Sequence, residues 1–450
     1  MPRPAVLLAF FALLAACGSG HDAVRSADAR TPESAAAPSA DTPYADATQP
    51  ASAPATPPRC DADTGGLTLP RGFCAAVFAD VDGSPRHIAV APNGDVYVAL
   101  TQRRAGGGAG VLALRDTNGD GKADQRQRFG PESGGSGIAV SGGWLYFAQD
   151  NGVLRWRMAP NQLVPAGQPQ TIVSGLPTGG HTAKTIALDG RGALFVNIGS
   201  RTNACQQEDR QRGSRGVDPC TELQTRAGIW RFDANRPGQT QAQGERFATG
   251  IRNAVGMAVS GGQLYAAMHG RDQLSDNWPQ LFDDRKNAEN PGEEFLQVNR
   301  GDDFGWPYCF YDVDQKKLVL APEYGGRGTE VARCAQKKAP IIVFPGHWAP
   351  ESVVIYGGTQ FPARYRGGAF IAFHGSWNRA PLPQAGFRVS FVPMRGAQAS
   401  GASETFAEVA GSSGGGRVAH RPMGLAAAPD GSLYLTDDAG GRIWRISWRG

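Results

Sequence analysis

One unit of sequence returns along most of the chain, and it constrains the fold more than any other feature. The unit is an apolar strand, a Gly-containing turn and a second strand with an aromatic residue near its middle. Apolar strands joined by Asn-Gly, Asp-Gly or Gly-Gly turns are typical of β-hairpins. Its copies span residues 88–98, 138–147, 186–196, 257–266, 425–435 and, in a more divergent form, 353–372.

Repetition of hairpins indicates a propeller, because each unit is a small sheet that cannot bury both faces alone. We therefore expect an all-β fold, a six-bladed β-propeller with long inter-strand loop insertions after Ser200, after His269 and around Arg379. A β-sandwich is the alternative, but it would not explain the return of one unit.

The N-terminus has the pattern of an export signal. Arg3 precedes an apolar run that ends in Leu14-Ala15-Ala16-Cys17. A run this short is a signal-peptide core and not a transmembrane span. Small residues before a cysteine match the lipobox of bacterial lipoproteins, so we expect a signal peptide over residues 1–16 and a lipid anchor at Cys17. An ordinary secretory signal with a chance cysteine is the alternative.

Residues 17–58 are rich in Ala, Pro, Ser, Thr and Asp and nearly free of large apolar side chains. Such a stretch cannot bury enough surface to fold, so we expect a disordered tether. The propeller then occupies residues 59–450. It would be held at the bacterial cell envelope, in the periplasm or at the outer membrane, with the N-terminal lipid as its only membrane contact.

The cysteines and the net charge narrow the class further. Of seven cysteines, six remain when Cys17 is set aside, and an even number in an exported chain favours disulfides. Connectivity stays open, with the local pairs 60–74, 205–220 and 309–334 as the simplest arrangement. No c-type haem motif occurs, so electrons would pass to a separate acceptor. The net charge of +4 is spread along the chain and does not indicate nucleic-acid binding.

One rim of a propeller collects the starts of the first strands and the ends of the second strands, since these strands are antiparallel. Basic residues and histidines gather at these positions, and such a set favours a site for a polyanion. They are His181, Lys184, Arg252, His269, His374 and Arg421, and the amide side chain of Asn253 joins them.

A separate loop, residues 116–124, places oxygen-bearing side chains at alternate positions: Asp116, Asn118 and Asp120. This matches the first half of an EF-hand calcium loop. The twelfth position is Gln127 instead of Glu, and no helices flank the loop. A structural Ca²⁺ site and a polar hairpin turn both remain open.

Several short segments together resemble the soluble quinoprotein sugar dehydrogenases, in particular the sorbosone-dehydrogenase branch. The resemblance runs from about Leu69 to the end of the chain. It implies a six-bladed propeller that holds pyrroloquinoline quinone (PQQ) over one mouth of its channel, with Ca²⁺ beside it. The segments are Gly179-Gly180-His181-Thr182, Ile251-Arg252-Asn253, His269-Gly270-Arg271-Asp272, Gly305-Trp306-Pro307, His374-Gly375-Ser376-Trp377-Asn378-Arg379 and Arg421-Pro422-Met423-Gly424.

The resemblance also implies roles for single residues. His181 matches the general base, and Arg252 with Asn253 matches the pair at the quinone, where Arg252 is also a catalytic candidate. The carbonyls of Gly270 and Arg271 match the calcium ligands. Two further arginines match cofactor-carboxylate positions, Arg421 directly and Arg379 where relatives place a lysine. The rim adds Lys184 and His374 as candidates for cofactor binding.

The chemistry of these residue types agrees with that resemblance. PQQ carries three carboxylates, for which the planar fork of arginine is suited. Oxidation of a sugar hydroxyl requires a base for the O–H proton, and histidine suits that role near neutral pH. Gly180 stands where glucose-oxidising relatives carry an aspartate, and Met423 replaces a second arginine. We therefore expect an aldose or sorbosone-type sugar as substrate.

Two other functions fit a six-bladed propeller. One is a calcium-dependent lactonase, which needs acidic metal ligands that converge on the channel. The other is a non-catalytic envelope protein that binds sugar.

Overall fold

The computed structural model describes residues 59–101, 108–409 and 418–450. The expected signal peptide, the anchor at Cys17 and the tether over residues 17–58 lie outside the described residues. None of the helices in the described part of the chain is long and apolar enough to cross a bilayer.

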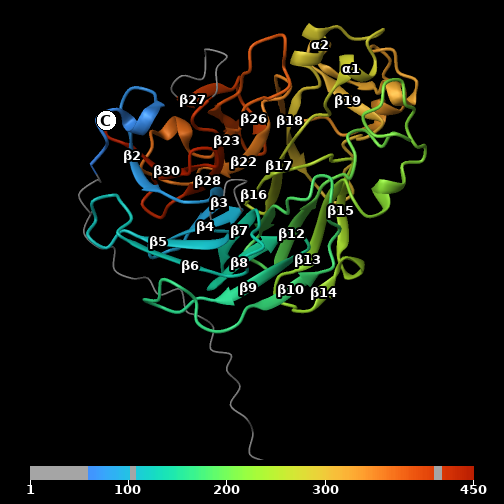
Figure 1. The fold of residues 1–450 in the computed structure, drawn as a ribbon. Helices are drawn as coiled ribbons and strands as arrows, with labels where there is room; N and C mark the ends of the chain where they lie inside the picture. Colours follow the sequence, from blue (N-terminus) through green and yellow to red (C-terminus); the bar gives the residue numbers. More distant parts are fainter. Residues whose placement is uncertain (1–58, 102–107, 410–417) are drawn as a thin grey trace, which may run out of the picture. The chain divides into compact units, whose positions relative to one another are not determined.

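The described residues form a six-bladed β-propeller, as the repeat predicts (Figure 1). Blades 1 to 3 contain the following strands. Blade 1 is β3 (Ser84–Val90), β4 (Val96–Thr101), β5 (Gly110–Arg115) and β6 (Gln125–Phe129). Blade 2 is β7 (Gly137–Ser141), β8 (Trp144–Gln149), β9 (Gly152–Arg157) and β10 (Gln170–Ser174), with β14 (Gln239–Thr240) at its edge. Blade 3 is β11 (Ile186–Leu188), β12 (Ala193–Ile198), β13 (Gly228–Asp233) and β15 (Glu245–Thr249).

Blades 4 to 6 complete the ring. Blade 4 is β16 (Gly256–Ser260), β17 (Gln263–Met268), β18 (Glu293–Val298) and β21 (Ile342–Phe344). Blade 5 is β22 (Pro350–Ile355), β23 (Ala369–Phe373), β24 (Arg388–Val392) and β27 (Glu404–Val409), with β1 (Leu67–Thr68) at its edge. Blade 6 is β28 (Pro422–Ala427), β29 (Leu433–Asp437), β30 (Arg442–Trp448) and β2 (Phe73–Asp80). The first strand of each blade contacts the first strands of both neighbouring blades.

Short elements lie outside the blades. The strands among them are β19 (Cys309–Asp312), β20 (Lys317–Leu320), β25 (Met394–Arg395) and β26 (Gln398–Ala399). The helices are α1 (Leu274–Asn277) and α2 (Asp284–Glu289), and the 3-10 turns are η1 (Thr64–Gly66), η2 (Thr221–Gln224), η3 (Gln241–Gln243), η4 (Pro322–Tyr324), η5 (Ala332–Gln336) and η6 (Ala363–Tyr365). Figure 1 shows α1, α2 and β19 together beyond the end of blade 4.

Both faces of each blade are buried against neighbouring blades. This burial explains why the sequences of the second strands are almost wholly apolar. In β4, Val96, Val98 and Leu100 pack against blade 6, whereas Tyr97 and Ala99 pack against blade 2. Successive side chains of a strand point to opposite faces, so a strand between two neighbours needs apolar residues at every position. One such cluster of buried side chains fills each space between neighbouring blades.

The ring is closed by strands from both ends of the described chain. Strand β2 pairs with β30, so that Phe73 lies opposite Trp448. The ring of Phe73 also meets those of Phe361 and Phe406 edge to face at centroid distances of 4.8 and 4.9 Å. Aromatic contacts of this geometry add to the energy of burial. The outer strand of blade 6, β2, is thereby held to blade 5 as well as to β30 of its own blade.

The three local disulfides expected from the cysteine spacing are confirmed: Cys60–Cys74, Cys205–Cys220 and Cys309–Cys334. The long insertions are also where the sequence predicts them. Residues 199–227, 269–292 and 374–387 each connect the second strand of a blade to its third strand. The end of a second strand and the start of a third lie on one rim, so all three insertions build up the same rim.

Candidate active site

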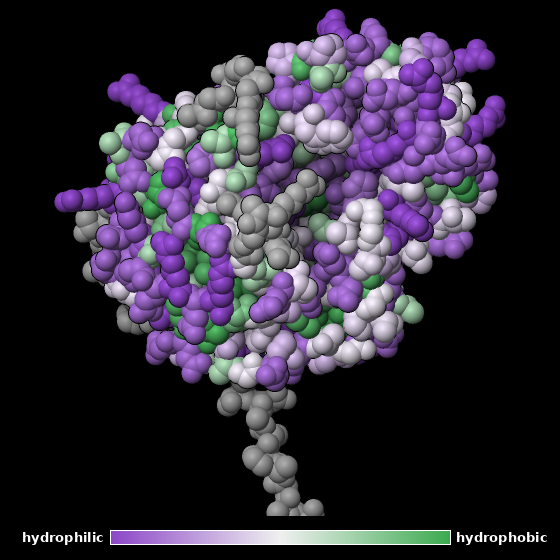
Figure 2. Space-filling view, in the orientation of Figure 1, coloured by the Kyte–Doolittle hydropathy of each residue, from purple (hydrophilic) through white to green (hydrophobic). Residues whose placement is uncertain are grey.

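A cavity of about 420 Å³ opens at this rim and is lined by residues from several blades and from the insertions. Its basic side chains are Arg86, Arg210, Arg252, His181, His269 and His347. Its acidic side chains are Asp272, Glu293 and Glu351. Cavities of a few hundred Å³ with a few convergent polar groups are typical of small-molecule sites. Hydrophilic side chains also dominate the surface over α1, α2 and β19 (Figure 2).

His181 precedes β11 and is held through one ring nitrogen. Its Nδ1 lies 3.0 Å from the carbonyl oxygen of Ser200 and 2.9 Å from the hydroxyl oxygen of the same residue. That hydroxyl donates its own hydrogen to the carbonyl of Thr202 at 2.7 Å. Both atoms of Ser200 therefore act as acceptors, which assigns the hydrogen to Nδ1 and leaves the lone pair on Nε2.

The surroundings of His181 keep its ring neutral. Burial is the main cause that lowers the pKa of His181, to about 3, and the positive charge of Arg252 acts in the same direction. A histidine with this pKa is unprotonated at neutral pH. The ring can therefore accept a proton at Nε2 from a molecule in the cavity.

Arg252 is buried and shares its guanidinium among fixed partners. Its Nη2 donates to Asp272 at 2.9 Å and to the side-chain oxygen of Asn203 at 3.1 Å. Its Nε donates to the carbonyl of Asn203 at 3.2 Å. Burial would raise the pKa of Asp272, but Arg252, His347 and Arg210 together outweigh burial and hold that pKa well below its usual value. Asp272 is therefore ionised and serves as the counterion of Arg252.

Two neighbours complete this part of the site. Asn253, which follows Arg252, is buried and accepts a hydrogen bond from the amide of Asn197 at 3.1 Å. Arg210 comes from the insertion after β12 and donates to Asp272 at 3.1 Å. One carboxylate thus fixes two arginines at the cavity.

The lining of the cavity contains two further histidines. His347 lies 3.7 Å from Asp272 through Nδ1, and its Nε2 lies 2.7 Å from the carbonyl of Asn287. Burial acts to lower the pKa of His347, but the hydrogen bond and the charge of Asp272 outweigh it, and the pKa is raised. His269 lies 2.9 Å from the carbonyl of Pro350. His347 thus favours a proton where His181 disfavours one.

Arg86 enters the cavity from blade 1 and is paired twice. It donates to Asp438 at 2.7 Å and to Glu351 at 3.4 Å. Its strand β3 changes register between Pro85 and Ile88, which is where this side chain leaves the regular strand pattern.

Four of the expected cofactor-binding residues are not among the residues that line the cavity. Lys184 is fully buried between blades, donates to the carbonyl of Thr182, and has its pKa lowered by burial to about 8. The Nε2 of His374 lies 2.6 Å from a carboxylate oxygen of Asp438. It therefore reaches the cavity only through a carboxylate that also binds Arg86.

The other two are arginines held by backbone carbonyls. Arg421 donates to the carbonyls of His374, at 2.9 Å, and of Gly375. Arg379 donates to the carbonyls of Pro383, Ala288 and Gly346 and to the carboxylate of Glu289. Arg379 is thereby fully engaged in fixing the loop over residues 374–387.

The expected calcium ligands Gly270 and Arg271 follow β17. Gly270 lines the cavity, and its N–H donates to Glu293 at 2.9 Å. Arg271 is buried, and its side chain pairs with Glu323. No described donor bonds to the carbonyl oxygen of either residue. Within the described ranges, no group of three His, Cys, Asp or Glu side chains is arranged to hold a metal ion.

The loop over residues 116–124 is a polar turn whose side-chain oxygens bond to its own backbone. Asp116 accepts from the N–H groups of Gly119 and Gly121 at 2.7 and 2.8 Å. Asn118 accepts from Asp120, and Asp120 accepts from Lys122, at 2.9 and 2.8 Å. These bonds hold the connection between β5 and β6 as a turn.

Sequence reasoning did not single out several cavity residues. Asp272 stands in a segment that carries the family resemblance, but no role was attached to it. Arg210 lies within the insertion after β12, and His347 lies in the short link just before β22, the first strand of blade 5, where the rim criterion applied but was not used. Their positions in the chain could have identified them. The links from the second to the third strand of a blade, and from the fourth strand of one blade to the first strand of the next, lie on the same rim as the site.

Comparisons with known proteins agree with this geometry. A family model described as TrAA12-like matches residues 67–449. The pyrroloquinoline quinone-dependent pyranose dehydrogenase of Coprinopsis cinerea is 25% identical over 323 residues, which are 62% of this chain and 41% of that protein. The matched stretch spans less than two thirds of the length of the curated relatives.

Solved structures share the fold. The holo form of the pyranose dehydrogenase PQQ domain from Coprinopsis cinerea has a TM-score of 0.69 at 21% identity, covering 87% of this chain and 98% of that one. The calcium structure of the family AA12 carbohydrate-active enzyme of Trichoderma reesei has a TM-score of 0.70 at 18% identity, covering 85% and 97%.

Proposed function

The chain belongs to the TrAA12-like family, and we propose that it is a quinoprotein oxidoreductase that oxidises an aldose or sorbosone-type sugar. The single observation that carries the proposal is a neutral histidine, His181, with its Nε2 lone pair available in a cavity that also holds three arginines. The relatives named as PQQ-dependent dehydrogenases support PQQ as the cofactor.

The residues of the cavity fit a flat, polycarboxylate cofactor. Arg86, Arg210 and Arg252 approach the cavity from separate segments, and each is fixed by a carboxylate before any ligand binds. Pre-fixed guanidinium groups lose little conformational entropy when they bind an anion. These arginines would hold PQQ through its carboxylates, and the bound quinone would supply a hydride acceptor for the oxidation of a sugar hydroxyl.

His181 would act on the sugar hydroxyl itself. Its Nε2 takes the O–H proton, while Ser200 continues to accept the hydrogen on Nδ1 and stabilises the imidazolium that forms. Arg252 carries a permanent charge beside the ring, so the protonated state is unfavourable and the proton is released readily. Asn253, next to Arg252 in the chain, would orient a cofactor oxygen.

Ca²⁺ would be held by the carbonyl oxygens of Gly270 and Arg271, which no described donor engages. Carbonyl oxygens are suited to this hard cation. A protein of the same fold has been solved as a calcium structure, which supports Ca²⁺ as the ion but not its ligands. The polar turn at Asp116, Asn118 and Asp120 is not needed for it.

Three parts of the proposal concern the rest of the protein. Gly180 and Met423 depart from the glucose-oxidising pattern, which favours another aldose or a sorbosone-type substrate. Electrons would pass to a separate acceptor. The pattern at Leu14-Ala15-Ala16-Cys17 supports a lipid anchor at the cell envelope.

The test is to load the purified protein with PQQ and Ca²⁺, record the absorption spectrum, and add single aldoses. We expect the bound quinone to be reduced by at least one aldose. Quinone binding without reduction by any sugar would refute the dehydrogenase proposal. No quinone binding, with sugar bound or a lactone hydrolysed instead, would favour the binding-protein or lactonase alternative.

A further inference from the structure

We propose that Glu222, which lies outside the cavity, is a positioning residue for both His181 and Arg252. It holds a short turn, residues 200–203, whose first residue orients the histidine and whose last residue orients the arginine. The catalytic meaning of this arrangement rests on the proposed function, whereas the geometry does not.

The two ends of the turn bind the two cavity residues. Ser200 accepts from Nδ1 of His181, and its own N–H donates to the carbonyl of Arg252 at 2.7 Å. Asn203 accepts from Nε and Nη2 of Arg252 and also accepts from the N–H of Asp272 at 2.9 Å. A displacement of the turn would therefore move the histidine, the arginine and its counterion together.

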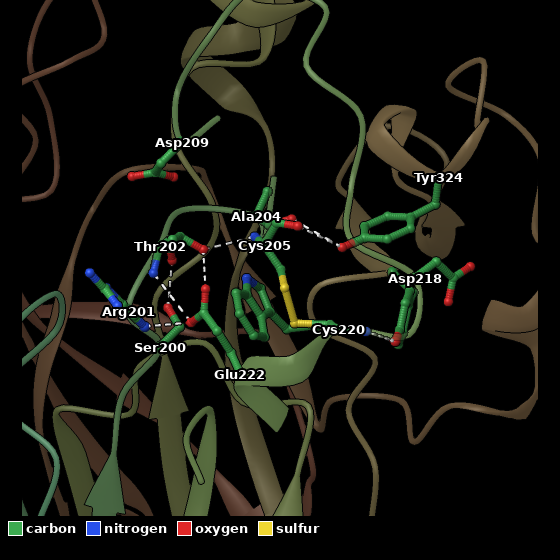
Figure 3. Close-up of a disulfide and its surroundings, with 12 residues drawn as sticks. Ser200, Arg201, Thr202, Ala204, Cys205, Asp209, Asp218, Cys220, Glu222 and Tyr324 are labelled. Carbon is green, nitrogen blue, oxygen red and sulfur yellow. Dashed lines mark hydrogen bonds between the residues drawn. A yellow bond between two sulfur atoms is a disulfide. The ribbon is translucent and has the colours of Figure 1, made fainter. Parts of the chain in front are cut away.

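The middle of the turn is held from outside by one carboxylate (Figure 3). Glu222 accepts from the backbone N–H of Arg201 at 2.6 Å and from that of Thr202 at 3.3 Å, and it accepts from the hydroxyl of Thr202. Hydrogen bonds to an ionised acceptor are stronger than neutral ones. The turn contains no regular secondary structure, so these bonds take the place that a strand ladder has elsewhere.

Glu222 is itself held close to the turn by a disulfide (Figure 3). Glu222 lies in η2, and η2 begins directly after Cys220. Cys220 is joined to Cys205. The N–H of Cys205 donates to the hydroxyl oxygen of Thr202 at 2.9 Å, and the N–H of Cys220 donates to the hydroxyl oxygen of Tyr308 at 2.8 Å. The turn and the carboxylate thus flank the two ends of the loop that this disulfide closes.

Loss of the carboxylate would leave two backbone N–H groups and a hydroxyl without their acceptor. The turn would then sample other positions, and Ser200 would no longer restrict His181 to one tautomer. A displacement of about 1 Å at a catalytic group can lower the rate by about 100-fold. We expect kcat to fall about 10- to 100-fold with little change in KM, because Glu222 contacts neither sugar nor cofactor.

The decisive readout is the tautomer of His181, measured by ¹⁵N NMR on protein labelled at histidine and without sugar. The signal of His181 is assigned by its absence in His181→Gln. We expect one tautomer, with the hydrogen on Nδ1, in the unsubstituted protein. Glu222→Ala should give a mixture of tautomers. Glu222→Gln keeps an oxygen for the backbone N–H groups and should restore most of the signal and most of kcat.

Asp218→Ala is the matched control. Asp218 lies inside the loop that Cys205–Cys220 closes and pairs with Arg333 at 2.6 Å, but it does not contact the turn (Figure 3). This variant should leave the tautomer and kcat unchanged. A second comparison removes one disulfide at a time. Loss of Cys205–Cys220 should give part of the tautomer mixture and part of the fall in kcat seen in Glu222→Ala, whereas loss of Cys60–Cys74 should give neither.

The proposal is overturned if folded Glu222→Ala keeps a single Nδ1–H tautomer and an unchanged kcat. If Glu222→Ala does not fold, Glu222→Gln decides, because this variant keeps an acceptor oxygen. A mixture of His181 tautomers in Glu222→Gln would then show that hydrogen-bond acceptance by this side chain is not what holds the ring. A protein that oxidises no sugar at all would refute the proposed function while leaving the NMR result valid.

Discussion

Replacing Ser200 by Asp would change the acidity of His181 in a direction and by an amount that the structure predicts. The hydroxyl oxygen of Ser200 lies 2.9 Å from Nδ1, and burial together with the charge of Arg252 lowers the pKa of His181 to about 3. An aspartate at this position would place a negative charge where the ring now meets a neutral acceptor. A negative charge stabilises the imidazolium, so the pKa must rise.

The size of the rise follows from the distance. Two unit charges about 4 Å apart interact by about 4 kcal/mol at an effective dielectric constant of about 20. Since one pKa unit corresponds to about 1.36 kcal/mol, the pKa of His181 should rise by about three units, to about 6. A base is active only when unprotonated. The acid limb of kcat/KM should therefore move from about pH 3 to about pH 6.

The assay is the pH dependence of kcat/KM between about pH 4 and 8, together with an NMR titration of His181 over the same range. The unsubstituted protein should show no acid limb from His181 in this range. Ser200→Asn, neutral and similar in size to Asp, is the control and should resemble it. An equal limb in Ser200→Asp and Ser200→Asn, or a limb near pH 6.5 in the unsubstituted protein, would refute the assignment of a desolvated, neutral base.

Three further outcomes are expected. His181→Gln should bind PQQ as tightly as before but turn over sugar about 10²- to 10⁴-fold more slowly, as measured by quinone absorbance and steady-state rates; an unchanged rate would remove His181 as the base. Asp272→Ala leaves Arg252 buried without its counterion and should lower the free energy of unfolding in urea by about 3 kcal/mol. Asp80→Ala removes an exposed ion pair and should lower it by less than about 1 kcal/mol, and equal losses would contradict this. Cys17→Ser should abolish incorporation of labelled lipid, and a parent protein without lipid would disprove the anchor.

The ring could be predicted from the sequence because its physical cause is local and repeated. Tyr97 and Val98 must both be apolar since each faces a different neighbouring blade, and this requirement recurs at every second strand. The disulfides followed from the spacing of the cysteines.

The site was predicted only in part, because a rim position does not fix where a side chain points. Lys184 lies at the expected place in the chain but extends between blades, and Arg379 turns toward four backbone and carboxylate acceptors of its own surroundings. Asp272 was missed for a related reason. Its importance arises from the burial of Arg252, and burial of one side chain by three separate segments is not visible in a linear pattern.

Blade 6 is built from β2, which is synthesised before all the other blades, and from β28 to β30, which are synthesised after them. Strand β2 therefore cannot pair until β30 has been made. While the chain is being made, β2 has no partner, and the aromatic surroundings of Phe73 do not exist until blade 5 is complete. Any product that stops before Trp448 would leave β2 unpaired along part of its length, with apolar faces of two blades exposed to water. Such a chain would be open to proteases and aggregation. Closure of the ring therefore makes the order of β2 depend on its pairing with β30 and on the completion of blade 5.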